Sequence, residues 1–208
     1  MKLRHLEMAL QRCSGFSRPK ASLEQYSTPA VVAARLLYHA NLQGDIVNRS
    51  VLDLGCGTGI LACGAALLGA APVAGIDIDA GAIAVAKRNA ELLQVSVDFV
   101  RGDIADDSVF HALCPRDTII MNPPFGAQVR HADRPFIDRA LACGAIVYAI
   151  LNAGTRPFLE KYLRGRGLVD QAVACTFPMR RSFSHHTRDS RDIPVEIVRI
   201  LRSGEASR

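Results

Sequence analysis

The arrangement of apolar and polar residues along the chain predicts strands that alternate with helices. Seven short segments rich in Val, Ile and Leu have the length and composition of β-strands: residues 50–56, 72–79, 96–104, 117–124, 145–151, 168–178 and 193–201. Six segments of helical character precede or separate them: residues 5–13, 27–41, 59–70, 80–94, 134–144 and 155–167. Apolar strands that alternate with helices predict a mostly parallel sheet covered by helices on both faces.

The last two predicted strands depart from this alternation, because only the polar segment 179–192 lies between them. A parallel pair needs a long crossover, so these two strands are expected to pair antiparallel at one edge of the sheet. We therefore predict an α/β fold with a seven-stranded mixed sheet. No repeat or long linker interrupts the chain, and residues 1–208 are expected to form one domain.

Composition narrows the classes of protein further. The chain has 208 residues, 49% of them hydrophobic, with a net charge of +5, which permits a nucleic-acid partner but is also common on ordinary solvated surfaces. No apolar stretch reaches about eighteen residues, so no membrane span is expected. The six cysteines form no Cys-x-x-Cys pair, and no metal site is expected. We predict a reduced, soluble, cytoplasmic protein without disulfides.

A glycine-rich turn links the strand 50–56 to the helix 59–70. Its sequence "DLGCGTG" places Gly55, Gly57 and Gly59 where the backbone approaches a ligand closely and offers N–H groups at a helix start. Glycine is also common in any tight turn between a strand and a helix. The G-x-G-x-G spacing differs from the dinucleotide fingerprint, which disfavours a nicotinamide-dependent oxidoreductase.

Three acids stand at the ends of successive predicted strands. Asp53, Asp77 and Asp103 would line one rim of a parallel sheet, and an acid after the second strand can accept hydrogen bonds from a ribose. Each of them alone could instead be an ordinary helix cap. Similarly, Thr28 is expected to cap the helix 27–41, with Pro29 in its first turn.

The tetrapeptide "NPPF" ends the strand 117–124. Two prolines stiffen whatever follows, so a stiff turn is one interpretation. The other is catalytic. The side-chain oxygen of Asn122 and the carbonyl of Pro123 could accept the two hydrogens of an amine, Pro124 would hold them rigidly, and the Phe125 ring would face a flipped-out base.

These motifs together resemble a known family. "DLGCGTG", "GIDID", "RGDI" and "NPPF" resemble class I S-adenosylmethionine-dependent methyltransferases of the N6-adenine type. With "LEQYSTPAVVAARLLY" and "SFSHHTRDSRDIPVEIVRI", nearly the whole chain is similar to the small-subunit ribosomal RNA adenine-N6 methyltransferases of archaea and eukaryotes, the methyltransferase-like protein five family. The resemblance implies a Rossmann-like class I fold and methyl transfer to the N6 amine of an adenine in structured RNA.

The resemblance also implies site residues and partners. Residues 1–45 would cover the cofactor site, and "NPPF" would be the catalytic motif. The cofactor would be held by Gln25, Tyr26, Thr28, Asp53, Gly55, Gly57, Thr58, Gly59, Ile60, Asp77, Asp103 and Ile104. Thr58 is a departure, because the family is expected to carry a cysteine there. In eukaryotes the family acts with a small zinc-binding activator protein, so such a partner is expected here.

The segment 179–192 carries basic residues that could hold RNA phosphates or form a solvated loop: Arg180, Arg181, His185, His186 and Arg188. Arg130 and His131, just past "NPPF", could form a lid over bound RNA.

Three alternatives remain open. Protein glutamine N5-methylation also uses an Asn-Pro-Pro-aromatic motif, DNA adenine methylation has the same chemistry, and a cofactor-binding assembly factor would need no catalysis. Phe125 and the terminal basic segment favour RNA over glutamine, and the chain has no inserted DNA target-recognition domain.

Overall fold

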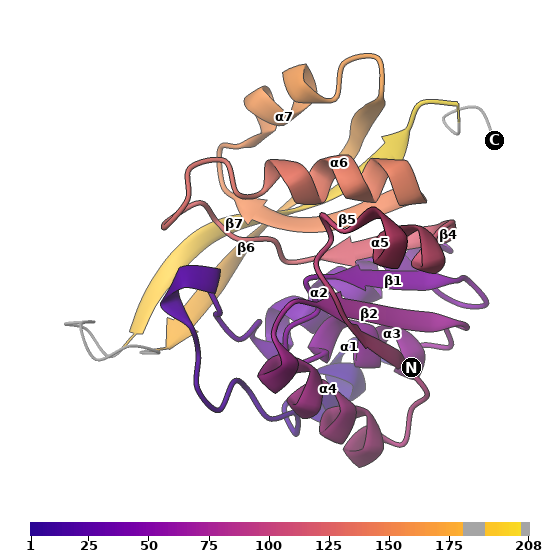
Figure 1. Ribbon diagram of the computed structural model, residues 1–208, viewed down its shortest axis with the longest axis vertical. Coiled ribbons are helices and arrows are strands. Elements are labelled where there is room, and N and C mark those ends of the chain that lie inside the picture. Colours follow the sequence, from indigo (N-terminus) through magenta and orange to yellow (C-terminus); the bar gives the residue numbers. More distant parts are fainter. Residues whose placement is uncertain (181–189, 205–208) are drawn as a thin grey trace.

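The computed structural model describes residues 1–180 and 190–204, and its core is one seven-stranded sheet (Figure 1). The strands are β1 (Val51–Leu54), β2 (Val73–Asp77), β3 (Asp98–Arg101), β4 (Arg116–Met121), β5 (Gly144–Asn152), β6 (Gly167–Arg180) and β7 (Ser190–Arg202). They follow the order β3-β2-β1-β4-β5-β7-β6. The first five pair in parallel, and β7 pairs antiparallel with both β5 and β6. The predicted α/β fold class is confirmed, with β6 as the edge strand beyond β7.

Two layers of helices cover the sheet. The helices are α1 (Leu3–Leu10), α2 (Ala30–Leu42), α3 (Ile60–Leu67), α4 (Ala80–Leu93), α5 (Asp107–Leu113), α6 (Arg134–Cys143) and α7 (Arg156–Tyr162), with a short 3-10 turn η1 (Ala21–Leu23). Apolar side chains of α1 to α4 form one core against the sheet, and those of α5 to α7 form a second core on its other face. Because β1 is buried along its whole length, its sequence is apolar except for Asp53 and lacks the regular alternation of a half-exposed strand.

Local predictions failed at three places. The sequence did not predict α5 or η1, which are short and lack a long apolar repeat. Thr28 was predicted to cap α2, but Pro29 occupies the cap position and no side chain bonds the helix start. The Thr28 hydroxyl is engaged in the site described below.

The terminal hairpin is longer than expected. The strands β6 and β7 extend into the segment 179–192, and the backbone of Arg180 pairs with that of Ser190. Arg180 therefore belongs to a strand. The other basic residues proposed to bind RNA lie outside the described residues: Arg181, His185, His186 and Arg188.

The prediction that all cysteines are reduced is wrong for one pair. Cys114 and Cys143 form a disulfide, with their Cα atoms 5.1 Å apart. Their proximity follows from the sheet register, because Arg116 of β4 pairs with Gly144 of β5 and each cysteine comes just before one of these residues. Among the described residues, no helix is long and apolar enough to cross a membrane.

Candidate active site

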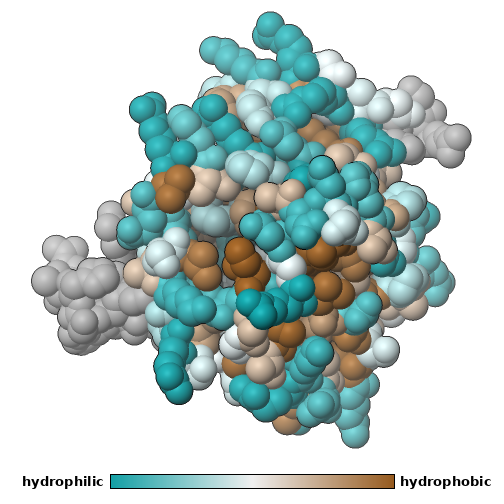
Figure 2. Space-filling model, in the orientation of Figure 1, coloured by the Kyte–Doolittle hydropathy of each residue, from teal (hydrophilic) through white to brown (hydrophobic). Residues whose placement is uncertain are grey.

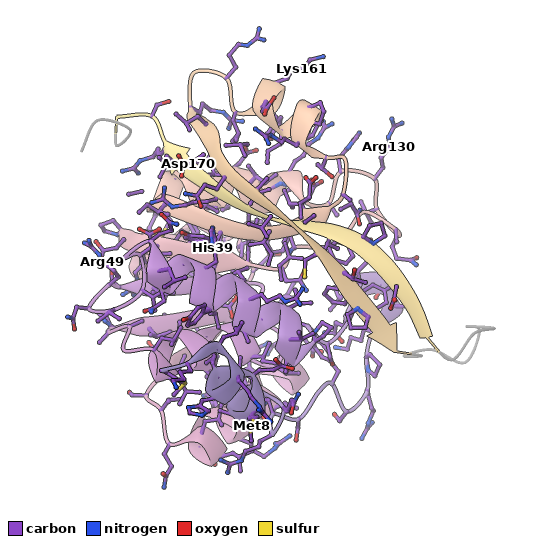
Figure 3. The ribbon with its side chains drawn as sticks, turned by 180° about the vertical axis from the view of Figure 1, so that it is seen from behind. Met8, His39, Arg49, Arg130, Lys161 and Asp170 are labelled. Atoms are coloured by element: carbon purple, nitrogen blue, oxygen red, sulfur yellow. A yellow bond between two sulfur atoms is a disulfide. The ribbon has the colours of Figure 1, made fainter. Side chains whose placement is uncertain are left out.

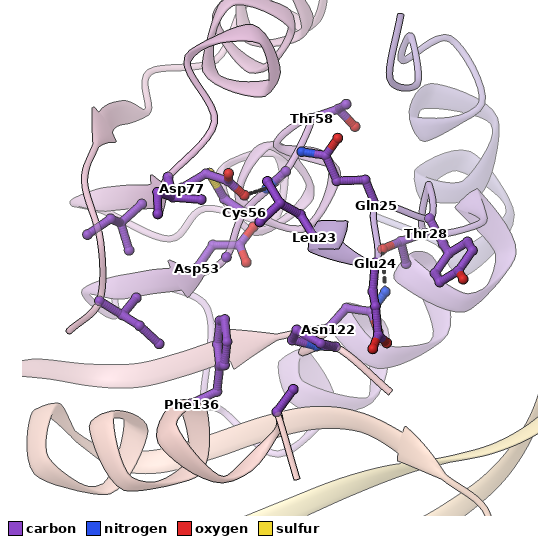
Figure 4. A pocket seen from close by; sticks show the side chains of 18 of the residues that line it. Leu23, Glu24, Gln25, Thr28, Asp53, Cys56, Thr58, Asp77, Asn122 and Phe136 are labelled. Carbon is purple, nitrogen blue, oxygen red and sulfur yellow. Dashed lines mark hydrogen bonds between the residues drawn. The ribbon is translucent and has the colours of Figure 1, made fainter. Parts of the chain in front are cut away.

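A cavity of about 390 Å³ lies at the carboxyl ends of β1, β2, β3 and β4 (Figure 4). Ligands in open α/β sheets bind at this edge. The acids Asp53 and Asp77 stand on one side of the cavity, and Asn122 and Glu24 on the other. The aromatic side chains of Phe16 and Phe136 complete its walls.

The glycine-rich turn forms the floor of this cavity. Gly55 and Gly57 have φ values of 67° and 52°, a region that side chains rarely allow. A Cβ atom on Gly55 would lie 2.8 Å from the Phe136 ring, and one on Gly57 would lie 2.9 Å from the Phe16 ring. The turn needs glycine for conformation and for space, so the backbone itself faces the ligand.

Asp53 is a buried acid with an unused oxygen. Its Oδ2 accepts a hydrogen bond from the Ala62 N–H at 3.0 Å, which fixes the start of α3. Its Oδ1 is buried and has no hydrogen-bond partner among the described residues. Burial raises the pKa of Asp53 to about 8, the Ala62 N–H lowers it, and the nearby Asp77 raises it.

Asp77 is held by the backbone around it. Its two oxygens accept hydrogen bonds from the N–H groups of Gly57 and Asp79, both at 2.8 Å. Burial raises the pKa of Asp77 above its ordinary value, although these two N–H groups oppose the shift. Each oxygen keeps a second lone pair, so the carboxylate can still accept a ligand hydroxyl.

The segment before α2 closes one side of the cavity. The Gln25 side chain donates to Asp79 at 2.8 Å and accepts from the Lys20 N–H, while the Lys20 ammonium pairs with Asp79 at 2.9 Å. The hydrogen bonds from Gln25 and Lys20 lower the pKa of Asp79. Within the N-terminal region 1–45, the cavity-lining residues lie in this segment, from Phe16 to Thr28, and not in α1 or α2.

Asn122 follows β4, and only one of the two polar atoms of its side-chain amide has a hydrogen-bond partner among the described residues. Its Nδ2 donates to the Thr28 hydroxyl at 2.9 Å, which fixes the orientation of the amide (Figure 4). Its Oδ1 is buried at the cavity and has no hydrogen-bond partner among the described residues. A buried acceptor without a partner is costly, so this atom is available for a donor on a ligand.

Glu24 is a site residue that the sequence patterns missed. It is 8% exposed, and its carboxylate accepts hydrogen bonds from the N–H groups of Gly126 at 3.1 Å and Gln128 at 2.7 Å. It thereby ties the N-terminal segment to the loop that carries "NPPF". A lone Glu in "LEQYST" has no spacing signal, because its partners lie about a hundred residues further along the chain.

Most of the residues predicted to form the site line this one cavity. They are Gln25, Tyr26, Thr28, Asp53, Gly55, Gly57, Thr58, Ile60, Asp77, Asp103, Ile104, Asn122 and Pro124. Gly59 caps α3 and Pro123 is buried, and neither lines the cavity. Phe125 points elsewhere: its ring packs edge-on against Phe177, with the ring centroids 5.7 Å apart.

Apolar side chains surround the mouth of the cavity. Leu23, Ile78 and Val129 are 37%, 49% and 61% exposed and line its edge. In the space-filling view, hydrophobic side chains gather in the middle of this face, with hydrophilic ones around them (Figure 2). Exposed apolar groups around a cavity are typical of a surface that meets a flat ligand such as a base.

The cavity suits a ligand that carries positive charge. The buried carboxyl group of Asp53 and the half-buried one of Asp77 both have raised pKa values, which indicates that negative charge is costly there unless a cation joins it. S-adenosylmethionine carries an ammonium group and a sulfonium group, together with a ribose and an adenine. The Oδ1 of Asp53, which has no hydrogen-bond partner among the described residues, could accept from the ammonium, and Asp77 could accept from the ribose hydroxyls. The fold and the site define a class I, S-adenosylmethionine-dependent methyltransferase.

The comparisons with known proteins identify the family. The model of the family described as "Methyltransferase small domain" matches residues 26–146. The rRNA N6-adenosine-methyltransferase METTL5 of Danio rerio is 35% identical over 96% of this chain and 98% of its own. An uncharacterized protein of Methanocaldococcus jannaschii is 42% identical over 98% of this chain and 96% of its own. The chain belongs to the METTL5-like family of methyltransferases.

A solved structure agrees with this assignment. The crystal structure of a Pyrococcus horikoshii protein, provisionally described as an RNA methyltransferase, superposes with a TM-score of 0.88 at 35% identity. The match covers 97% of this chain and 98% of the other. The shared fold therefore extends over nearly the whole length of both proteins.

Proposed function

We propose that this protein transfers the methyl group of S-adenosylmethionine to the N6 amine of an adenine in ribosomal RNA, and specifically in the small subunit. The observation that carries the proposal is the Oδ1 of Asn122, which is buried beside the cofactor cavity and has no hydrogen-bond partner in the described part of the chain. The names of the METTL5 relatives support rRNA as the substrate. Such work would take place in the cytoplasm.

The chemistry required of the protein is mainly placement. When bound, S-adenosylmethionine supplies a methyl group already activated by its positively charged sulfur. The N6 amine of adenine is a poor nucleophile, because its lone pair is delocalised into the ring. Asn122 Oδ1 accepts one amine hydrogen and the Pro123 carbonyl accepts the other. Two fixed acceptors favour a pyramidal nitrogen with its lone pair aimed at the methyl group.

The rest of the loop keeps these acceptors in position. The Thr28 hydroxyl holds the Asn122 amide by accepting a hydrogen bond from its Nδ2, so the Oδ1 of Asn122 faces the amine. Glu24 fixes the backbone after Phe125 through Gly126 and Gln128. S-adenosylmethionine would supply the methyl group, the electron pair of the broken C–S bond would stay on its sulfur, and one amine proton would pass to solvent.

We propose that the Phe125 ring faces the target base. In this structure its ring contacts Phe177, so it would have to share or change that contact to face a base. A small zinc-binding activator protein is proposed as a partner that raises activity, on the basis of the family resemblance. Adding a purified activator of this type to the assay below tests that partner.

The deciding assay offers the purified protein and methyl-labelled cofactor three substrates separately: small-subunit ribosomal RNA, adenine-containing DNA and release-factor protein. Digestion and mass spectrometry identify the product. N6-methyladenosine in the RNA alone supports the proposal. Label in protein as N5-methylglutamine, with none in RNA, overturns it. No label anywhere, with or without the activator, favours a cofactor-binding assembly factor.

A further inference from the structure

A second cavity, of about 270 Å³, opens on the other side of the "NPPF" loop. Pro124 lines both this second cavity and the cofactor cavity, so the two are separated only by the loop that carries Asn122. The second cavity lies between this loop, the end of β5 and the start of α7. Its walls include Phe125, Asn152 and Phe158. The Asn152 side chain donates to the Phe125 carbonyl at 3.1 Å and thereby fixes the loop from this side.

Basic side chains gather at the second cavity. Arg130, His131 and Arg134 line it, and Asp133 is the acid that accompanies them. Two guanidinium groups against one carboxylate leave the cavity positively charged even when His131 is neutral. Figure 3 shows Arg130 extending outward from the chain. The salt bridges among the described residues include neither Arg130 nor Arg134.

Arg134 is held in place without neutralising its charge. Its guanidinium carbon lies 4.7 Å from the Phe158 ring centroid and 5.6 Å from that of Tyr162. Its Nε is buried and has no hydrogen-bond partner among the described residues. Stacked aromatic rings orient a guanidinium without neutralising its charge. The Arg134 Nη2 also lies 3.4 Å from the Nε2 of His131, which lines the same cavity. Such a group is ready to bind an anion.

We infer that the second cavity binds a backbone phosphate of the RNA strand next to the target adenosine. This inference rests on the proposed function and goes beyond it by naming where the strand runs. When a base is flipped toward Asn122, the backbone phosphates on either side of its nucleotide must lie near the loop, about one nucleotide away from it. Arginine is suited to phosphate because its planar fork presents two parallel N–H groups. Phosphate contacts of this kind set the register of the strand.

The test measures binding, so that it does not depend on turnover. The probe is a fluorescent single-stranded RNA with one adenosine among uridines, titrated by anisotropy in the presence of S-adenosylhomocysteine. Its partner probe replaces the phosphates on either side of the adenosine by neutral methylphosphonates. The protein variants are the double change Arg130→Gln with Arg134→Gln and, as a matched control, Arg88→Gln, an exposed arginine on α4 across the sheet.

The double variant is expected to bind the normal RNA roughly tenfold more weakly, the loss typical of charge-assisted hydrogen bonds. The slope of log affinity against log salt is expected to become shallower by about 0.7 for each lost phosphate contact. Methylphosphonate RNA is expected to bind the wild-type protein as weakly as the double variant, with no further loss when the two changes are combined. Arg88→Gln is expected to leave all these values unchanged.

The inference would be overturned if the losses of affinity caused by the methylphosphonates and by the double variant simply added, or if the wild-type protein and the double variant bound the RNA equally well. It would also be overturned if the wild-type protein did not bind this RNA. Because Arg134 packs on Phe158, its loss could disturb α7, so the exposed single change Arg130→Gln and the charge-preserving Arg134→Lys are measured in parallel. Both are expected to show intermediate affinities and an unchanged thermal midpoint. Non-additive binding without any N6-methyladenosine would contradict the proposed reaction while supporting the phosphate site.

Discussion

The two halves of the active site are built in different ways. The half proposed to hold the cofactor, at the ends of β1 and β2, consists of backbone N–H groups and of acids that neighbouring N–H groups hold in place. The half proposed to hold the target base, after β4, consists of a loop whose position depends on side chains from the N-terminal segment. We refer to them as the cofactor half and the target half. Thr28 holds Asn122, and Glu24 holds Gly126 and Gln128.

This difference separates binding from catalysis. Changes in the cofactor half should weaken cofactor binding, and changes in the target half should slow methyl transfer while the cofactor still binds. The link between the halves is the segment before α2, since Gln25 bonds Asp79 and the adjacent Glu24 bonds the catalytic loop. Four measurements test this division.

The largest effect is expected from Asn122→Ala. The change removes an acceptor that the target amine uses mainly in the transition state, so turnover should fall by roughly 10²–10³. Cofactor affinity, measured by calorimetry, should remain within about twofold, because Asn122 bonds Thr28 and not the glycine turn. Gln43→Ala is the control, because it removes an exposed amide side chain at the end of α2 that lines neither cavity. Near-normal turnover in Asn122→Ala would remove "NPPF" from the mechanism.

The second largest effect is expected from Asp77→Ala in the cofactor half, where the change should weaken cofactor binding and not the methyl-transfer step. Asp77→Ala removes the proposed ribose acceptor and also frees the N–H groups of Gly57 and Asp79. Cofactor affinity should fall by roughly 10- to 100-fold, the range for lost charge-assisted hydrogen bonds. With saturating cofactor, turnover should largely recover. Asp98→Ala, an exposed acid on β3, serves as the control, and equal affinities for the two variants would argue against Asp77 as a ligand.

Glu24 tests the link between the two halves. Glu24→Ala leaves the N–H groups of Gly126 and Gln128 without their acceptor, so the loop loses its anchor. Turnover should fall by about tenfold with little change in cofactor affinity, because an anchor acts through positioning. Glu24→Gln keeps one acceptor oxygen and should recover part of the rate.

Hydrogen exchange distinguishes this positioning role from general destabilisation. The amides of Gly126 and Gln128 should exchange faster in Glu24→Ala, while those of the sheet keep their protection. Glu91→Ala, an exposed change on α4, is the control. Faster exchange throughout the protein would instead mean that Glu24 supports the fold as a whole.

The same division explains what the sequence could predict. The strands, the glycine turn and the acids of the cofactor half were predicted correctly as to position, because each is a local pattern at the end of a strand. The anchors of the target half were not, because they join residues about a hundred positions apart. Thr28 looked like a helix cap from its neighbours, whereas in the fold its hydroxyl serves Asn122. The disulfide was missed for a similar reason, since only the pairing of β4 with β5 brings Cys114 to Cys143.

The smallest expected effect is a pH dependence confined to the cofactor half. Burial raises the pKa of Asp53 to about 8, so this carboxyl is largely protonated at lower pH in the free protein. A cationic ligand beside it lowers that pKa, and binding therefore releases a proton. Affinity should rise as pH increases toward about 8, and Asp77, whose pKa is also raised, acts in the same direction.

The ligand's own amino group begins to lose its charge near pH 8, which limits the useful range to between about pH 6 and about pH 7.5. Over that range, calorimetry should show an increase of roughly fivefold per pH unit, within the tenfold limit for one released proton. The heat should also vary with the ionisation enthalpy of the buffer. Asp53→Asn should flatten this dependence, whereas Asp98→Asn should keep it. If the wild-type affinity did not change with pH, the Asp53 carboxyl would not be the group that meets the cofactor's ammonium, and the charge argument for the cavity would fail.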